Sequence, residues 1–199
     1  IQNSNRIPLI FIDSYSNVRQ LINIGIDDYK GGQLAADYFL KKGHKTLGFV
    51  GPFTKIGGVI TKRYQGFTDT LAKHHISLTP DHVYDMEKME PSEIIDSILQ
   101  DNCPPSGLFV FSDEIALQLS NIASKKNLAI PSRLSLIGFD DLPSFCTTFD
   151  MLTTIHQDIY RKAEITCKIL FEHIADPDRP SENVTLDVRM VERNSVSTQ

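Results

Sequence analysis

The chain has 199 residues, of which 41% are hydrophobic, and its 20 basic and 25 acidic residues give a formal net charge of −5. These charges are mixed along the chain without a basic run, which argues against direct nucleic-acid or membrane binding by these residues. The longest apolar runs are far shorter than the roughly 20 residues that cross a bilayer. Because Ile1–Arg6 is polar and does not resemble a signal peptide, and the three cysteines are odd in number and widely spaced, we expect a reduced, cytoplasmic protein without a membrane span.

Short apolar runs alternate with segments of helical periodicity along the whole chain. The runs predict buried strands at Ile7–Ile12 and Ser135–Phe139, and further strands at Thr46–Val50, His82–Tyr84 and Leu108–Phe111. Ile24–Ile26 and Met151–Ile155 are predicted to be extended pieces, and the alternating segment Val184–Arg193 is predicted to form one or two strands. The periodic segments predict helices from Asp27 or Asp28 to Lys42, then at Ile60–His74, Pro91–Gln100, Asp113–Lys126 and Asp158–Ile174. Gly43 is expected to end the first helix, Asp113 to cap the fourth, and Ile159, Ala163, Thr166 and Leu170 to form one stripe on the last. This alternation with short connections predicts an α/β fold with a parallel sheet flanked by helices.

Polar residues recur where the predicted strands end: Asp13, Ser112, Asp113, Asp140 and Asp141. In open α/β sheets this edge is where ligands bind. Helix capping is the favoured explanation for Asp113 and Asp28. For Asp13 and Asp140 a ligand contact is favoured, because no helix begins directly after either residue. Several such groups at one edge suit a hydroxyl-rich ligand, which needs paired donors and acceptors.

The remaining polar residues do not assemble into a catalytic or metal site. The six histidines show no metal-ligand spacing, and a structural hydrogen bond is the favoured role of His156. Asp140 and Asp141 are neighbours in an extended segment and point to opposite sides, so they do not form an acid–base pair. Two interpretations of Arg63 have equal weight: a solvent-exposed helix residue, or an arginine that donates two hydrogen bonds to a pair of hydroxyls or to a carboxylate. We therefore expect neither enzyme activity nor a cofactor, and a hydrolase or isomerase that used Asp13 or Asp140 would need a partner base or metal.

Five motifs occur in a fixed order along the chain: Gly43–Pro52 (GHKTLGFVGP), Arg63–Phe67 (RYQGF), Phe109–Leu117 (FVFSDEIAL), Ile130–Pro143 (IPSRLSLIGFDDLP) and Leu152–Asp158 (LTTIHQD). Together they resemble the effector-binding core of the LacI/GalR family of bacterial transcriptional repressors. Each motif is moderately specific by itself, and the five in register extend the resemblance over nearly the whole chain.

The resemblance implies a periplasmic binding protein type I-like fold of two Rossmann-like subdomains with parallel sheets. The first subdomain is expected to be incomplete in this chain, because the family's helix-turn-helix and the first two strand–helix units have no counterpart before Ile1. The implied division is residues 1–26 in the N-terminal subdomain, 27–155 in the C-terminal subdomain, 156–188 back in the N-terminal subdomain, and 189–199 as a final crossover and tail. Hinge residues are then expected at Ile26, Asp27, Thr154 and Ile155.

Effector contacts are implied at six positions that match the family's motifs: Asp13, Arg63, Met86, Ser112, Asp140 and Gln157. Ser112 stands where sugar-binding members often have asparagine, so its reach is shorter. Met86 stands where many members carry an aromatic ring that stacks on the effector, which weakens the expectation of such stacking here. Asp141 is expected to support the loop after the strand.

The implied function is the sensing of a small effector, a sugar or sugar phosphate first and a purine second, in a cleft between the subdomains. Binding would shift the orientation of the subdomains in a homodimer that reaches operator DNA through the missing helix-turn-helix. A solute-binding protein of a sugar transporter shares the fold and remains the alternative.

Overall fold

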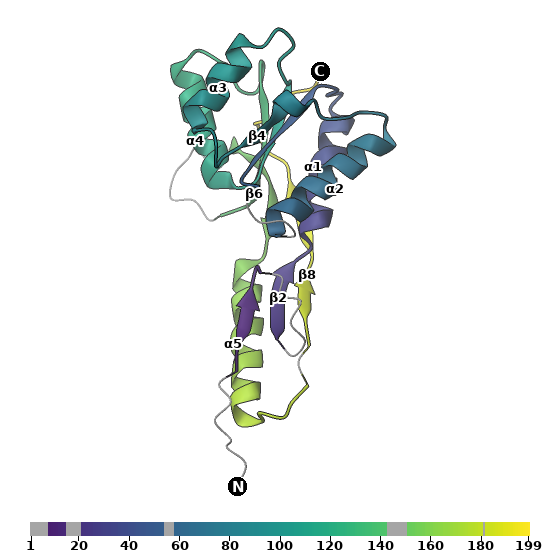
Figure 1. Cartoon of the computed structure of the whole chain (residues 1–199), viewed down its shortest axis with the longest axis vertical. Coiled ribbons are helices and arrows are strands. Elements are labelled where there is room, and N and C mark those ends of the chain that lie inside the picture. The colour runs from purple at the N-terminus through teal and green to yellow at the C-terminus, as the bar shows by residue number, and fades with distance from the viewer. Residues whose placement is uncertain (1–7, 15–20, 54–57, 143–150, 181) are drawn as a thin grey trace. The chain divides into compact units, whose positions relative to one another are not determined.

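A computed structural model describes residues 8–14, 21–53, 58–142, 151–180 and 182–199 (Figure 1). The chain folds as two compact units. Unit 1 comprises Ile1–Asp27 and Gln157–Val188, and unit 2 comprises Asp28–His156 and Arg189–Gln199. Within the described ranges, no helix combines the length and the apolar character needed to span a membrane.

The sheet of unit 2 has six strands in the order β4-β3-β5-β6-β7-β9. Its members are β3 (Leu47–Gly51), β4 (Val83–Asp85), β5 (Gly107–Val110), β6 (Ser135–Asp140), β7 (Thr153–Gln157) and β9 (Val188–Val191). Strand β3 pairs in parallel with β4 and β5, and β6 pairs in parallel with β5 and β7. Parallel strands run in the same direction, so the residues that follow them meet at one edge of the sheet.

Helices cover both faces of this sheet. They are α1 (Asp28–Lys41), α2 (Val59–Lys73), α3 (Pro91–Gln100) and α4 (Asp113–Lys125), with α1 and α2 on one side of the sheet and α3 and α4 on the other (Figure 1). The side chains of successive β5 residues point to opposite faces of the sheet. Leu108 and Val110 join the aliphatic core under α3 and α4, whereas Phe109 packs on the rings of Phe49 and Phe67. Burial on both faces explains why these strands read as continuous apolar runs.

Two glycines allow α1 and α2 to approach closely. A Cβ on Gly66 would lie 1.9 Å from the carbonyl oxygen of Tyr29, and one on Gly32 would lie 2.0 Å from that of Arg63. The obstructing atoms are backbone, so a side chain at either position would force the helices apart. Gly43 ends α1 with φ +89°, as predicted for a C-terminal glycine.

The polar segment 194–199 is hydrogen-bonded into unit 2. The Ser195 hydroxyl donates to the Leu136 carbonyl of β6 at 2.6 Å and accepts from the Thr153 amide of β7 at 2.8 Å. Further along, the Gln199 amide donates to the Lys42 carbonyl at 2.9 Å. The family resemblance implied only a final crossover and tail in this part of the chain.

Unit 1 consists of a small sheet and one helix. The sheet has the order β1-β2-β8, with β1 (Ile10–Ile12), β2 (Ile22–Ile26) and β8 (Val184–Leu186) all parallel. Helix α5 (Ile159–Ala175) begins after Asp158, whose side chain accepts a hydrogen bond from the Arg161 amide at 2.8 Å.

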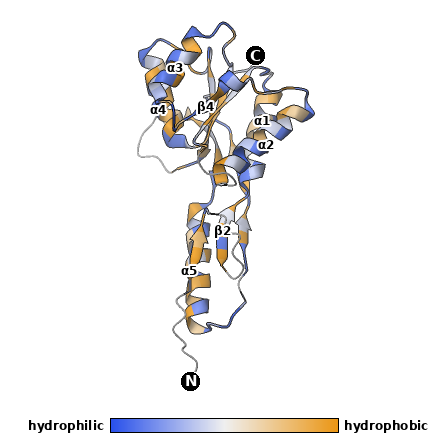
Figure 2. Cartoon of the chain, in the orientation of Figure 1, coloured by the Kyte–Doolittle hydropathy of each residue, from blue (hydrophilic) through white to orange (hydrophobic). Residues whose placement is uncertain are grey.

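Figure 2 colours much of α5 as hydrophobic, yet only Lys162 and His173 of this helix are buried. Of the four residues of the predicted stripe, Ala163 is exposed and Ile159, Thr166 and Leu170 are half-buried. The described part of unit 1 offers a sheet of only three strands, which covers little of a helix 17 residues long.

The predicted α/β class with parallel sheets is confirmed, and most elements lie within two residues of their predicted bounds. One capping prediction was wrong. Ser112, and not Asp113, is the N-cap of α4, and its hydroxyl accepts from the Ile115 amide at 3.4 Å. Asp113 is the first residue of α4, and its buried side chain accepts hydrogen bonds from Thr154 and Leu142 instead of capping the helix.

Candidate functional site

Arg63 of α2 connects the ends of β5 and β6 in unit 2. Its guanidinium donates to Asp28 Oδ1 at 2.8 Å and to the Phe111 carbonyl at 2.5 Å, and it lies 3.4 Å from the centre of the Phe139 ring. Phe111 precedes Ser112, and Phe139 precedes Asp140. The structure therefore brings Arg63, Ser112 and Asp140 to one region of the sheet edge.

The burial of Arg63 contradicts the solvated helix residue that was one of its two roles considered from sequence. Arg63 is 6% exposed and Asp28 is 1% exposed, so the ion pair is removed from solvent. Asp28 begins α1 as expected, but its carboxylate serves the arginine of the neighbouring helix. The hydrogen bonds among the described residues engage two of the five N–H donors of the guanidinium, so Arg63 is at once a structural and a candidate ligand-binding residue.

Asp113 is a buried carboxyl group next to this region. It accepts hydrogen bonds from the Thr154 hydroxyl of β7 at 2.6 Å and from the Leu142 amide at 3.3 Å. Gly138 makes space for it, because a Cβ there would lie 2.2 Å from the carboxyl oxygen. Burial raises the pKa of Asp113 to about 7, the Thr154 hydrogen bond opposes this, and the negative charge of Asp140 adds to it.

Asp113→Asn is expected to change how stability depends on pH. The folded-state pKa of Asp113 is about 7 and lies above the unfolded value of about 3.9, so the folded state holds its proton where the unfolded state has lost it. The contribution of Asp113 to the free energy of unfolding is fully present below pH ~4. It falls by about 1.4 kcal/mol for each pH unit between pH ~4 and pH ~7. Urea denaturation from pH 4 to 7.5 should show the variant gaining stability relative to wild type as pH rises. The exposed neighbour variant Glu114→Gln should show no such trend, and parallel curves for Asp113→Asn would contradict the assignment.

Asp140 and Asp141 follow β6 with different partners. Asp140 ends the strand with φ +116°, and Asp141 has φ +52°. The Asp141 carboxylate accepts from Arg193 at 2.6 Å and pairs with the His156 ring nitrogen Nδ1 at 2.8 Å. Burial alone would raise the pKa of Asp141, but the hydrogen bonds from Arg193 and His156 outweigh burial and lower it. The structural hydrogen bond expected of His156 is confirmed, whereas most of the loop that Asp141 was expected to support lies outside the described residues.

Met86 lies at the same edge of the sheet but away from these residues. It directly follows β4, and its amide donates to the Gly51 carbonyl at the end of β3. The strand order places β4 two positions from β5 and three from β6. Its half-buried side chain packs against the aliphatic core.

A second group of candidate residues lies in unit 1. Asp13 follows β1 with φ +49°, and Gln157 ends β7. Lys162 of α5 donates to both, at 2.5 Å to Asp13 Oδ2 and 2.6 Å to Gln157 Oε1. The structure thus brings together the two residues predicted in this unit, through a lysine that sequence reasoning missed.

The predicted hinge residues lie close to the places where the chain passes from one unit to the other. These places follow Asp27, His156 and Val188. Ile26 and Asp27 directly precede the first, and the Asp27 amide donates to the Leu186 carbonyl. Thr154 and Ile155 are fully buried in β7 and precede the second.

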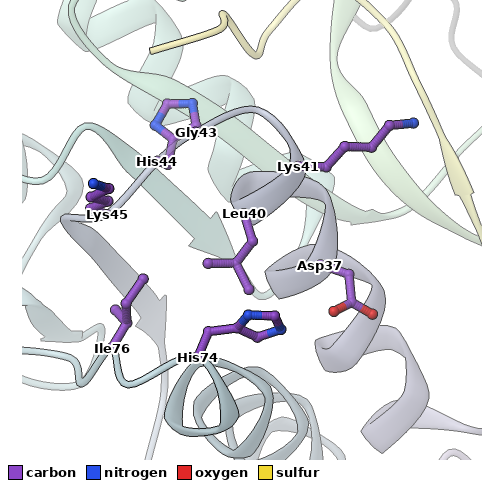
Figure 3. A pocket seen from close by; sticks show the side chains of 8 residues that line it. All are labelled: Asp37, Leu40, Lys41, Gly43, His44, Lys45, His74 and Ile76. Carbon is purple, nitrogen blue, oxygen red and sulfur yellow. The ribbon is translucent and has the colours of Figure 1, made fainter.

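The described surface also has a pocket away from the predicted residues. It has a volume of about 470 Å³ and lies where α1 and α2 end, and Figure 3 shows the Leu40 and His74 side chains in the same space while Lys41 points away. Its lining residues are Asp37, Leu40, Lys41, Gly43, His44, Lys45, His74 and Ile76. The His44 ring is committed to Ser106 and Ser197, and burial lowers its pKa. In the described part of the chain, no three His, Cys, Asp or Glu residues are placed to hold a metal ion.

Sequence reasoning missed Lys162 and the core position of Asp113. A signal for Lys162 was available, since it lies three residues after Ile159 and four before Thr166, within the stripe predicted for this helix. A lysine at such a position needs a charged partner. Asp113 gave no separate signal, because an aspartate at the start of a helix is ordinarily explained by the helix dipole or capping.

Comparison with known proteins gives these groups a context. Residues 36–196 match the family described as "periplasmic binding protein-like domain". Among curated proteins, the chain is 27% identical to the HTH-type transcriptional repressor PurR of Pasteurella multocida and 26% identical to the probable HTH-type transcriptional repressor ExuR of Bacillus subtilis. These matches cover 100% and 96% of this chain but 60% and 57% of the relatives, so the chain spans about three fifths of their length.

Solved structures agree with this assignment. The LacI family transcriptional regulator from Enterococcus faecium, with bound ribose, superposes with a TM-score of 0.83 at 27% identity, over 96% of this chain and 71% of that one. The corresponding regulator from Enterococcus faecalis, also with bound ribose, gives a TM-score of 0.82 at 27% identity, over 97% and 70%. The chain belongs to the periplasmic binding protein-like domain family and has the sequence and fold of the effector-binding core of LacI/GalR regulators.

Proposed function

We propose that this chain is the ligand-sensing core of a LacI-type transcriptional repressor and that its effector is a sugar. The observation that carries the proposal is the grouping of Arg63, Ser112 and Asp140 at the carboxyl ends of β5 and β6. Asp13 and Gln157 form the second group, at the ends of β1 and β7. We propose that both groups bind the effector.

The chemistry of these residues suits a polyhydroxylated ligand. Carboxylates accept hydrogen bonds from sugar hydroxyls, and a guanidinium donates to hydroxyl or carbonyl oxygens. Met86 can supply apolar contact but no aromatic stacking. A phosphate on the sugar would find Arg63 already paired with Asp28, so an unphosphorylated sugar is the better candidate.

Binding would regulate the protein by favouring one of two conformations. An effector shifts such an equilibrium only through a difference in its affinity for the two states. The proposed whole protein is a cytoplasmic homodimer without enzyme activity that binds operator DNA through a helix-turn-helix. The repressor names of the relatives support this assignment over a transport protein.

A purine base is the second candidate effector. The relatives named PurR are 27–30% identical to this chain, and a carboxylate together with a guanidinium can hydrogen-bond the edge of a base as well as hydroxyls.

Asp140→Asn is expected to weaken effector binding at least tenfold. The change keeps the shape of the side chain, and asparagine tolerates the positive φ, but the amide loses the charge that strengthens hydrogen bonds from hydroxyls. Isothermal titration of the full-length protein against ribose, cellobiose, a hexose, a hexuronate, hypoxanthine and guanine measures the effect.

The exposed variant Asp81→Asn, in the 3₁₀ turn Pro80–His82, is the matched control and should bind as wild type does. Sugar binding lost in Asp140→Asn and retained in Asp81→Asn supports the proposal. If a purine binds and no sugar does, the purine takes the place of the sugar as the proposed effector. Binding that is indifferent to Asp140→Asn would remove this residue from the site.

A further inference from the structure

Lys162 is a buried lysine in helix α5 of unit 1. Its side chain is 7% exposed, and its ammonium group lies between two acceptors that come from different strands. Asp13 follows β1, and Gln157 is the last residue of β7, five residues before Lys162. One side chain on the first turns of α5 therefore joins the two candidate residues of this unit.

An ammonium group in this position is costly to desolvate, and its attraction to a carboxylate often only balances that cost. Replacement of a buried ion pair by apolar side chains is frequently neutral or stabilising. The folding of α5 alone therefore does not require a lysine here, and its neighbours in the same stripe, Ile159 and Thr166, are uncharged. The two residues that Lys162 contacts are the candidate effector-binding residues of unit 1.

The contact also fixes the orientation of the Gln157 amide. An ammonium group can only donate, so the Gln157 atom that faces it must be the oxygen, and the amide nitrogen points to the opposite side. The Asp13 carboxylate is held through Oδ2 while its side chain remains 41% exposed. Lys162 thus orients the Gln157 amide as a donor and the Asp13 carboxylate as an acceptor. Its positive charge also balances the negative charge of that carboxylate.

We propose that Lys162 is a positioning residue of the effector site, which orients Asp13 and Gln157 as a net-neutral donor and acceptor pair for adjacent hydroxyls of an uncharged sugar. The proposal rests on the proposed function for its ligand, but the orientation of the amide is a property of the protein alone. Two measurements separate these claims.

The first measurement needs no ligand. In ¹⁵N-labelled full-length protein, the heteronuclear NOE of the Gln157 side-chain NH₂ reports whether the amide is ordered. We expect an ordered amide in wild type and in Lys168→Met, an exposed lysine of the same helix, and a disordered amide in Lys162→Met. Methionine keeps the length and apolar stem of the lysine, so the helix is expected to fold. An amide that is equally ordered in Lys162→Met overturns the proposal.

The second measurement is the dissociation constant for ribose, or for the panel sugar that binds most tightly. We expect Lys162→Met and Asp13→Asn each to weaken binding about tenfold, and the double variant to bind no more than about threefold more weakly than either. If the factor by which the double variant weakens binding equals the product of the two single factors, Lys162 does not act through Asp13. That result would overturn the proposal. If wild type binds no sugar, the proposed sugar effector fails, and the amide measurement still decides the role of Lys162.

Discussion

Arg63→Met is expected to lower the free energy of unfolding by about 3–5 kcal/mol, because it removes the guanidinium from a buried ion pair. The partner carboxylate of Asp28 is 1% exposed and would lose its guanidinium partner in a nearly dry environment. The change also removes the donor to the Phe111 carbonyl and the cation over the Phe139 ring. Urea denaturation followed by far-ultraviolet circular dichroism measures the loss, since four of the five described α-helices belong to unit 2.

Two further variants separate this mechanism from a general loss of an arginine. Asp28→Asn combined with Arg63→Met should recover a large part of the lost stability, because no buried charge is then left without its guanidinium partner. Arg161→Met removes an exposed arginine paired with Glu164 and should cost at most about 1 kcal/mol. A loss in Arg63→Met no larger than that in Arg161→Met would show that the buried pair does not stabilise unit 2.

This expectation affects how ligand binding should be tested. A loss of effector binding in an Arg63 variant would combine a missing contact with a disturbed fold. Asp140→Asn is the better probe of the site, because Asp140 is only partly buried and lies at the end of its strand.

Gly66→Ala is expected to destabilise unit 2 by about 3 kcal/mol or more, despite the gain of up to about 1 kcal/mol in helix propensity. The new methyl group would lie 1.9 Å from the Tyr29 carbonyl oxygen and 2.8 Å from its carbon, so α1 and α2 would have to separate. The chemical denaturation experiment that measures Arg63→Met applies here too. Gln65→Ala, at the exposed neighbouring position, should leave the stability nearly unchanged.

The paired glycine provides a stricter test. Gly32→Ala meets the Arg63 carbonyl oxygen at 2.0 Å on the other side of the same helix contact. Once the helices have moved apart for one methyl group, the second should add little, so the double variant should lose clearly less than the sum of the two single losses. Fully additive losses would mean that each glycine is confined by separate contacts.

The fold could be predicted from sequence because its strands are buried on both faces and its helices carry ordinary boundary signals. Leu108–Val110 is apolar without alternation, and Gly43 adopts the positive φ expected after a helix. Polar segments gave weaker signals. The burial of Ser195 among the backbone groups of Leu136 and Thr153 depends on contacts about 40–60 residues distant in sequence, which no local pattern reveals.

The candidate site was predictable in part for the same reason. Asp13 and Asp140 follow apolar runs, whose ends can be located from sequence, whereas Gln157 was expected as a contact only from the family resemblance. The partners of these residues cannot be located in this way. By sequence, Lys162 and Asp28 are ordinary helix residues. Lys162 gains its role from the packing of α5, and Asp28 gains its role from the packing of α1 against α2.

The backbone of the aspartates limits how this site can change its specificity. Asp13, Asp140 and Asp141 are three of the five non-glycine residues with positive φ in the described ranges, and glycine and asparagine are the other residues that readily adopt a positive φ. A library that varied Asp13 or Asp140 freely would add strain on the order of 1 kcal/mol to most of its members before any ligand was tested. Ser112 has a φ of −148° that suits any residue, and Met86 directly follows the edge strand β4 without a positive φ, so new ligand preferences can be selected at these two positions without that backbone strain.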